Sequence, residues 1–159
     1  MKNNILDIVE YFPNKIKEIL IRYEEVLYKV QEIHIYTNRN ILLRTSLEEI
    51  KLEYITNTNE ILEILQRICD NSIYTYQNQI CNGFITIKGG HRVGITGEVV
   101  VKEGQVINIS YIYSLNFRIA REVIGCSNKV LPYILDVNEN TVYNTIILSP
   151  PRKRKDHFN

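Results

Sequence analysis

The residues with the clearest chemical potential form a cationic turn, His91 and Arg92, directly after two glycines, Gly89 and Gly90. Glycine adopts backbone angles that other residues avoid, so this pair predicts a break between two strands. No Ser-His-Asp spacing, metal-ligand cluster or paired acidic motif accompanies the turn. We therefore expect no catalytic residue and no metal site in this chain, and we consider the turn as a binding feature.

Strand patterns surround the turn. Residues 84–88 alternate apolar and polar side chains, and β-branched residues dominate. The next strand contains Gly94 and Gly97, which predict a bulge or a close approach of another backbone. The predicted strands of this antiparallel meander are 84–88, 92–102, 106–113 and a candidate fourth, 117–122.

The N-terminal half predicts helices and a strand pair. Apolar residues recur at helical spacing between Ile16 and Leu27, and Asn57 with Glu60 is typical of a capping box. The elements predicted here are helices 5–11, 13–27 and 71–82, a helix capped by Asn57, and strands 31–36, 41–45 and 52–56. A short helix over 128–135 follows later. The fold class is α+β, with N-terminal helices packed on an antiparallel or mixed sheet.

Composition restricts the class of protein. The 159 residues are 45% hydrophobic and 23% charged, which is ordinary for a soluble domain. The formal net charge of +1 predicts no strongly acidic or basic partner. No apolar run reaches the roughly 20 residues that cross a bilayer, and no signal peptide is evident, so we expect a cytoplasmic protein. Three widely spaced cysteines without a CxxC pair argue against disulfides and zinc.

Two segments together carry a family resemblance. GFITIKGGHRVGITGEVV followed by SLNFRIAREVIG closely resembles the stage III sporulation protein AA family of endospore-forming bacteria, and EIHIYTNRNILLRT resembles its first strand pair. The family is similar to type II and type IV secretion ATPases, with an N-terminal α+β domain before a P-loop ATPase domain. The resemblance implies an α+β domain over 1–136. It also implies a linker and a first ATPase strand over 137–151, with 144–149 as a buried strand.

The resemblance also implies a biological setting. In the intact family we expect ATP hydrolysis with Mg²⁺ on the mother-cell side of the double membrane around the forespore. The activity would power or assemble the sporulation channel with other stage III proteins, from a homo-hexameric ring peripheral to the membrane.

Nucleotide-phosphate contacts are implied by similarity to the secretion ATPases. The candidates are Arg92, Arg118, Arg121, His91, Gly89 and Gly90. A guanidinium group suits phosphate by charge and by its forked geometry. The alternative interpretation is that these arginines pair with carboxylates such as Glu98 or Glu122, and that His91 is a neutral turn residue.

The end of the sequence departs from the family pattern. The family continues from a buried strand through SPP into GxGKTT, whereas here Ser149-Pro150-Pro151 leads into RKRKDHFN. Without the loop amides, its lysine and its hydroxyl, we expect no ATP turnover and no tight binding of ATP or Mg²⁺. One inserted base would convert codons for PGKGKTTL into codons for PRKRKDHFN. We therefore interpret 152–159 as a frameshifted basic tail, the alternative being a genuine basic tail.

Two other functions remain open. A free-standing nucleic-acid-binding domain would use the turn and the basic tail on phosphates, and Tyr111 and Tyr113 to stack on bases. The near-zero net charge argues against a nucleic-acid partner. A protein-interaction module that docks through its sheet is the other alternative.

Overall fold

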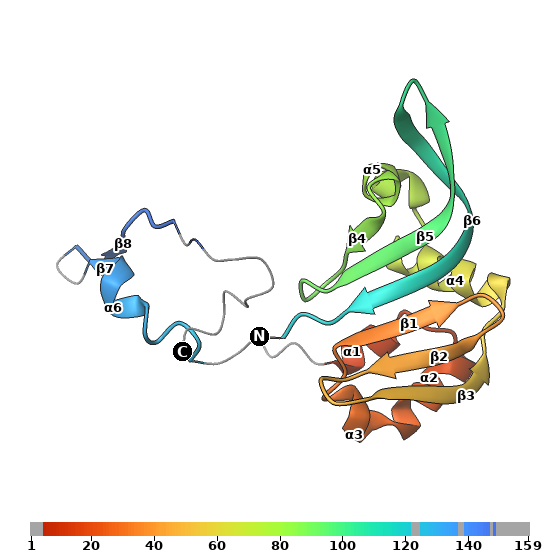
Figure 1. Ribbon diagram of the computed structural model, residues 1–159, viewed down its shortest axis with the longest axis horizontal. Helices are drawn as coiled ribbons and strands as arrows, with labels where there is room; N and C mark the ends of the chain where they lie inside the picture. Colours follow the sequence, from red (N-terminus) through yellow and green to blue (C-terminus); the bar gives the residue numbers. More distant parts are fainter. Residues whose placement is uncertain (1–4, 122–124, 137–138, 147, 149–159) are drawn as a thin grey trace. The chain divides into compact units, whose positions relative to one another are not determined.

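The computed structural model describes residues 5–121, 125–136, 139–146 and 148 (Figure 1). The chain divides into two compact units, one ending at Ala120 and the other beginning at Arg121. The domain boundaries expected from the family resemblance, at residues 136 and 151, stay predictions.

One six-stranded antiparallel sheet organises the first unit, in the order β3-β2-β1-β6-β5-β4. Its strands are β1 Glu32–Tyr36, β2 Asn40–Arg44, β3 Glu49–Ile55, β4 Phe84–Thr86, β5 Arg92–Lys102 and β6 Gln105–Arg118. Two meanders, β1-β2-β3 and β4-β5-β6, join where β1 pairs with β6. The α+β prediction is confirmed, and of the two predicted sheet types the antiparallel one is found.

Within residues 5–120, helices cover one face of this sheet, and no helix of that range covers the other, open face (Figure 1). They are α1 Leu6–Val9, α2 Asn14–Arg22, α3 Glu24–Leu27, α4 Thr58–Ile68, the 3-10 helix η1 Ile73–Tyr76 and α5 Gln77–Cys81. Alternate strand residues such as Ile33 and Val93 are fully buried beneath them, as strand periodicity requires. Near the middle of the core, the rings of Phe12 and Phe117 lie 5.0 Å apart.

The α4 helix begins with the predicted capping box. Asn57 Oδ1 accepts from the backbone N–H of Glu60 at 3.0 Å, and Glu60 Oε2 accepts from the N–H of Asn57 at 2.9 Å. These two bonds satisfy amides that a helix start would leave without partners. The Tyr54 hydroxyl also donates to Glu60, which links β3 to this helix start.

Several predicted elements differ in the structure. The predicted helix 13–27 is two helices, α2 and α3, which are separated at Tyr23. The predicted helix 71–82 is a 3-10 turn followed by the short α5. The predicted strands 106–113 and 117–122 are one strand, β6, which ends at Arg118. The sequence predicted a break over residues 114–116, but residues 114–118 pair with β1. A partner strand stabilises extended backbone even where the local preference for it is weak.

A bulged segment lies where Gly97 was predicted to mark one. The register of β5 against β6 shifts on both sides of Gly97. A Cβ atom at this position would lie 2.7 Å from Ile109 Cγ2 and 2.9 Å from the carbonyl oxygens of Ser110 and Tyr111. Only glycine lets the two strands approach this closely. Gly94, by contrast, has ordinary space around it.

The second unit carries α6 Leu131–Ile134 and a two-stranded pair, β7 Leu135–Asp136 and β8 Thr141–Val142. The buried strand predicted over 144–149 is not found in its described residues, 144–146 and 148. These have no strand structure, and Ile146 and Leu148 are 86% and 90% exposed. An apolar run becomes a buried strand only where neighbouring elements cover it. Within the described ranges, no helix has the length and apolar character needed to span a membrane.

Candidate functional site

The glycine turn between β4 and β5 is a tight, hydrogen-bonded loop. Ile87 N–H donates to the His91 carbonyl at 2.9 Å, and Gly90 N–H donates to the Ile87 carbonyl at 3.1 Å. Gly89 and Gly90 adopt φ angles of 87° and 77°, which side chains with a Cβ rarely tolerate. The turn therefore needs both glycines in order to place His91 and Arg92 at the start of β5.

His91 lies inside the structure, although the sequence places it in a turn. Its side chain is 3% exposed, and its Nδ1 accepts from the backbone N–H of Ala120 at 2.9 Å. An accepting Nδ1 places the ring proton on Nε2, which describes a neutral imidazole. This agrees with the interpretation of a neutral turn histidine, and its contact with an anion stays a prediction.

Arg92 and Arg118 face each other across neighbouring strands. They are Cα partners in the register of β5 and β6. Directly opposite residues in an antiparallel pair have Cβ atoms about 4.5–5.5 Å apart, so the two side chains leave the sheet together. Both residues are exposed, and the Arg92 guanidinium lies over the Phe84 ring, 5.3 Å from its centre. The sheet thus brings two of the predicted arginines into one cationic pair.

This pair is part of a row that crosses all six strands on the open face and is charged on every strand except β4. From β3 to β4, successive Cα partners are Glu49, Arg44, Glu32, Arg118, Arg92 and Thr86. At the β1–β3 end, acids and bases alternate. Arg44 lies 3.0 Å from Glu49 and 3.5 Å from Glu32, and His34 Nε2 lies 2.8 Å from Glu32.

Arg92 and Arg118 differ from Arg44 in their electrostatic surroundings. Over residues 5–121, no carboxylate lies within ion-pair distance of either guanidinium, whereas Arg44 has two. Glu98, one of the acids considered as a partner, accepts from the Tyr113 hydroxyl instead. Glu122, the other acid, lies outside the described residues. The Arg92–Arg118 pair therefore has two adjacent positive charges without a neutralising ion pair in that range.

Arg121, the third predicted arginine, is the first residue of the second unit. Burial lowers the pKa of its guanidinium from the ordinary value. The first unit thus brings together Arg92 and Arg118, whereas Arg121 belongs to the second unit.

Comparison with known proteins shows which family the chain belongs to. The sequence model of the family described as "Sporulation stage III, protein AA" matches residues 2–158. The chain belongs to the stage III sporulation protein AA family. A curated relative, "Stage III sporulation protein AA" of Bacillus subtilis (strain 168), is 33% identical over 150 residues, which is 94% of this chain and 48% of the relative. The chain thus spans about half the length of that relative.

A solved structure shows a more distant likeness. The alignment with the Legionella pneumophila ATPase DotB covers 76% of the present chain and 32% of the DotB chain. The sequence identity is 16% and the TM-score is 0.46.

Sequence reasoning missed a neighbour of the arginine pair in this family member. Asn116 lies two residues before Arg118 on the same face of β6, between His34 of β1 and Gly94 of β5. Its Oδ1 is buried and has no hydrogen-bond partner among the described residues. Period-two alternation from Arg118 was the only signal that could have found it.

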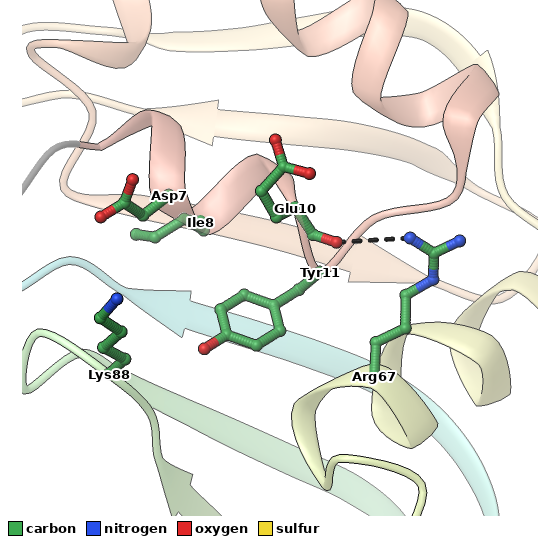
Figure 2. A pocket seen from close by; sticks show the side chains of 6 residues that line it. All are labelled: Asp7, Ile8, Glu10, Tyr11, Arg67 and Lys88. Carbon is green, nitrogen blue, oxygen red and sulfur yellow. Dashed lines mark hydrogen bonds between the residues drawn. The ribbon is translucent and has the colours of Figure 1, made fainter.

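A separate pocket of about 340 Å³ lies beside the glycine turn between β4 and β5 (Figure 2). Its lining residues are Asp7, Ile8, Glu10, Tyr11, Arg67 and Lys88. The Arg67 guanidinium already has partners within the protein. It donates to the Glu10 and Phe12 carbonyls and pairs with the Glu63 carboxylate at 2.8 Å. Burial, and then the Asp70 carboxylate, raise the pKa of the Tyr11 hydroxyl. The pocket mixes acids and bases, so it does not form a cationic site like the Arg92–Arg118 pair.

Proposed function

We propose that this chain is the N-terminal module of a stage III sporulation protein AA-like ATPase, and that Arg92 and Arg118 contact nucleotide phosphate. The supporting observation is their direct cross-strand pairing, in which neither guanidinium lies within ion-pair distance of a carboxylate in the described part of the first unit, although Glu32 lies opposite Arg118 on β1. Like charges directly opposite each other destabilise a sheet. A bound phosphate would relieve that repulsion and accept hydrogen bonds from both guanidinium groups.

The intact ATPase would bind ATP together with Mg²⁺, and the phosphates of the ATP would supply the reacting group. In this chain Arg92 and Arg118 offer positive charge and forked donors to those phosphates, while the glycine turn and His91 hold Arg92 in position. The sequence carries SPP but no GK[ST], so the lysine and hydroxyl of a phosphate-binding loop are missing from it. We propose weak phosphate binding without ATP turnover.

The cellular role is also a proposal. The relative's name places that protein in sporulation, and by membership of its family we propose that the intact form powers or assembles the mother cell–forespore channel. It would act as a homo-hexamer with other stage III proteins, on the mother-cell side and peripheral to the membrane.

Titration with ATP and with pyrophosphate tests the phosphate role. We expect weak, salt-sensitive binding to the full chain by calorimetry or NMR, weakened at least about tenfold by Arg92→Ala and by Arg118→Ala. Arg44→Ala is the matched control, because Arg44 lies in the same row but is already paired with two acids. Equal binding by all three variants would contradict the proposal, as would measurable ATP hydrolysis by the chain.

Two further measurements separate the alternatives. Sequencing the DNA across codons 145–159 and beyond tests the frameshift, which predicts a shifted frame encoding GKGKTT and an ATPase domain. Titration with single-stranded RNA tests the nucleic-acid alternative. Salt-dependent RNA binding, with no response to ATP or pyrophosphate, would replace the phosphate proposal by that alternative.

A further inference from the structure

The β5–β6 arm, residues 98–110, extends beyond the strands on either side of it (Figure 1). β4 pairs only with residues 92–94 of β5, and one further bond joins Ile95 N–H to the Gly83 carbonyl. β1 pairs with β6 only from Ser114 onward. In the described part of the first unit, the outer edges of the arm therefore have no neighbouring strand.

The two edges of the arm are not alike. Each of the three register shifts between β5 and β6 skips one residue on β6: Tyr113, Tyr111 and Ile107. The bulges thus lie on β6, and bulges make a strand a poorer template for pairing. Gln77 of α5 also donates to the Ile107 carbonyl at 3.1 Å, which occupies part of the β6 backbone. β5 has no inserted residue between Glu98 and Lys102.

The β5 edge also carries exposed apolar side chains. Val99, Val100 and Val101 are 54%, 42% and 55% exposed, and they follow one another without an intervening charge. Natural proteins protect exposed edges with charges, prolines or bulges, and a regular apolar edge is a template for another strand. A charge stands at each end of the valine run, Glu98 before it and Lys102 after it.

We propose that two copies of this chain associate by antiparallel pairing of their β5 edges, centred on Val100. In this register Val99 lies opposite Val101 of the second copy, and Glu98 lies opposite its Lys102. Two-fold symmetry repeats each contact, so the interface holds two opposite-charge pairs around an apolar centre. A register centred on Val101 instead places Lys102 opposite Val100 and loses both charge pairs. Charge complementarity therefore selects both the partner and the register.

The interface is small, so the dimer should be detected only at high protein concentration. Pairing over residues 98–102 buries far less surface than a standard protein interface, so the association is weak and reversible. It does not depend on phosphate binding, because Arg92 and Arg118 lie outside the arm.

Sedimentation equilibrium of the full chain at increasing concentration tests this pairing. We expect a monomer–dimer equilibrium for the wild type. Glu98→Lys and Lys102→Glu should each weaken self-association at least about tenfold, because two attractive pairs become repulsive. The double variant E98K/K102E should restore it, and so should an equimolar mixture of the two single variants. This rescue distinguishes the proposed register from general surface repulsion.

Matched controls separate the arm from the rest of the surface. Lys15→Glu and Glu18→Lys make the same charge changes on exposed positions of α2 and should leave the equilibrium unchanged. Tyr113→Phe removes the hydroxyl that donates to Glu98 but keeps both charges, so it should also leave dimerisation intact. A wild type that stays monomeric at every concentration would overturn the proposal. Single variants that dimerise like the wild type, or a double variant that does not recover, would do the same.

Discussion

The imidazole Nδ1 of His91 accepts a hydrogen bond from the backbone N–H of Ala120 at 2.9 Å. His91 ends the glycine turn between β4 and β5, and Ala120 follows the end of β6. The bond therefore joins the two sequence segments that carry the family resemblance, GGHRVG and SLNFRIARE. It holds the turn beside the strand end from which Arg118 projects.

Replacing His91 tests this connection. His91→Ala leaves the half-buried Ala120 N–H without its acceptor, so we expect the free energy of unfolding to fall by about 1–3 kcal/mol. His91→Phe should also destabilise, because it restores volume but not the acceptor. Urea unfolding followed by tyrosine fluorescence measures the change, since the chain has 11 tyrosines and no tryptophan. The half-buried His34 is the control, and an equal loss in His34→Ala would contradict a special role for His91.

Gly97 and Gly94 form a matched pair for the bulge. We expect Gly97→Ala to destabilise the protein by about 1–3 kcal/mol, because its Cβ would lie 2.7 Å from Ile109 Cγ2 and 2.9 Å from two carbonyl oxygens. Gly94→Ala should cost much less, since its nearest neighbours, in Asn116, are 3.8 and 3.9 Å away. Urea midpoints of the two variants decide this, and equal midpoints would argue against close approach at Gly97.

The capping box of α4 predicts a loss on removal of Asn57. Asn57→Ala should lower the free energy of unfolding by about 1 kcal/mol, because the Glu60 N–H loses its acceptor. Asn57→Asp keeps an acceptor oxygen and should retain most of the stability. Denaturant unfolding of both variants tests this, and an alanine variant as stable as the wild type would show that water replaces the cap without cost.

Cys69 predicts a pH dependence at alkaline pH. Burial, and then the Asp70 carboxylate, raise the pKa of its thiol from 9.0 to about 11. The folded state therefore favours the neutral thiol, and this contribution to stability is complete below pH 9 and is lost as pH rises through about 11. Unfolding free energies of wild type and Cys69→Ala should converge over that range.

Alkylation gives an independent test of the burial of Cys69, which both raises its pKa and limits access of the reagent. Because the thiolate is the reactive form, iodoacetamide should modify Cys69 in the folded protein more slowly than the half-buried Cys81 and Cys126. Mass spectrometry of the digested protein follows each site. Equal rates at the three cysteines before unfolding would contradict a raised pKa at Cys69.

Local sequence patterns succeeded where the cause is local. Residues 92–102 were predicted as a strand with the bounds that β5 has, and Asn57 with Glu60 predicted the observed capping box. Both depend on residues within a few positions of each other, through strand propensity and short-range hydrogen bonds. The predictions of one continuous helix over 13–27 and another over 71–82 were wrong, because each is two shorter elements in the structure. Tertiary packing decided where each helix breaks.

Residue types and their order were enough to predict the family, the α+β class and the glycine turn that begins β5. Three relationships became known from the folded chain: Arg92 lies opposite Arg118, His91 is buried and bonded to Ala120, and β6 runs unbroken to Arg118. These relationships join residues 26 or more positions apart through the pairing of β1, β5 and β6. Strand register and long-range hydrogen bonds depend on the whole sheet, and no local pattern of residue types specifies them.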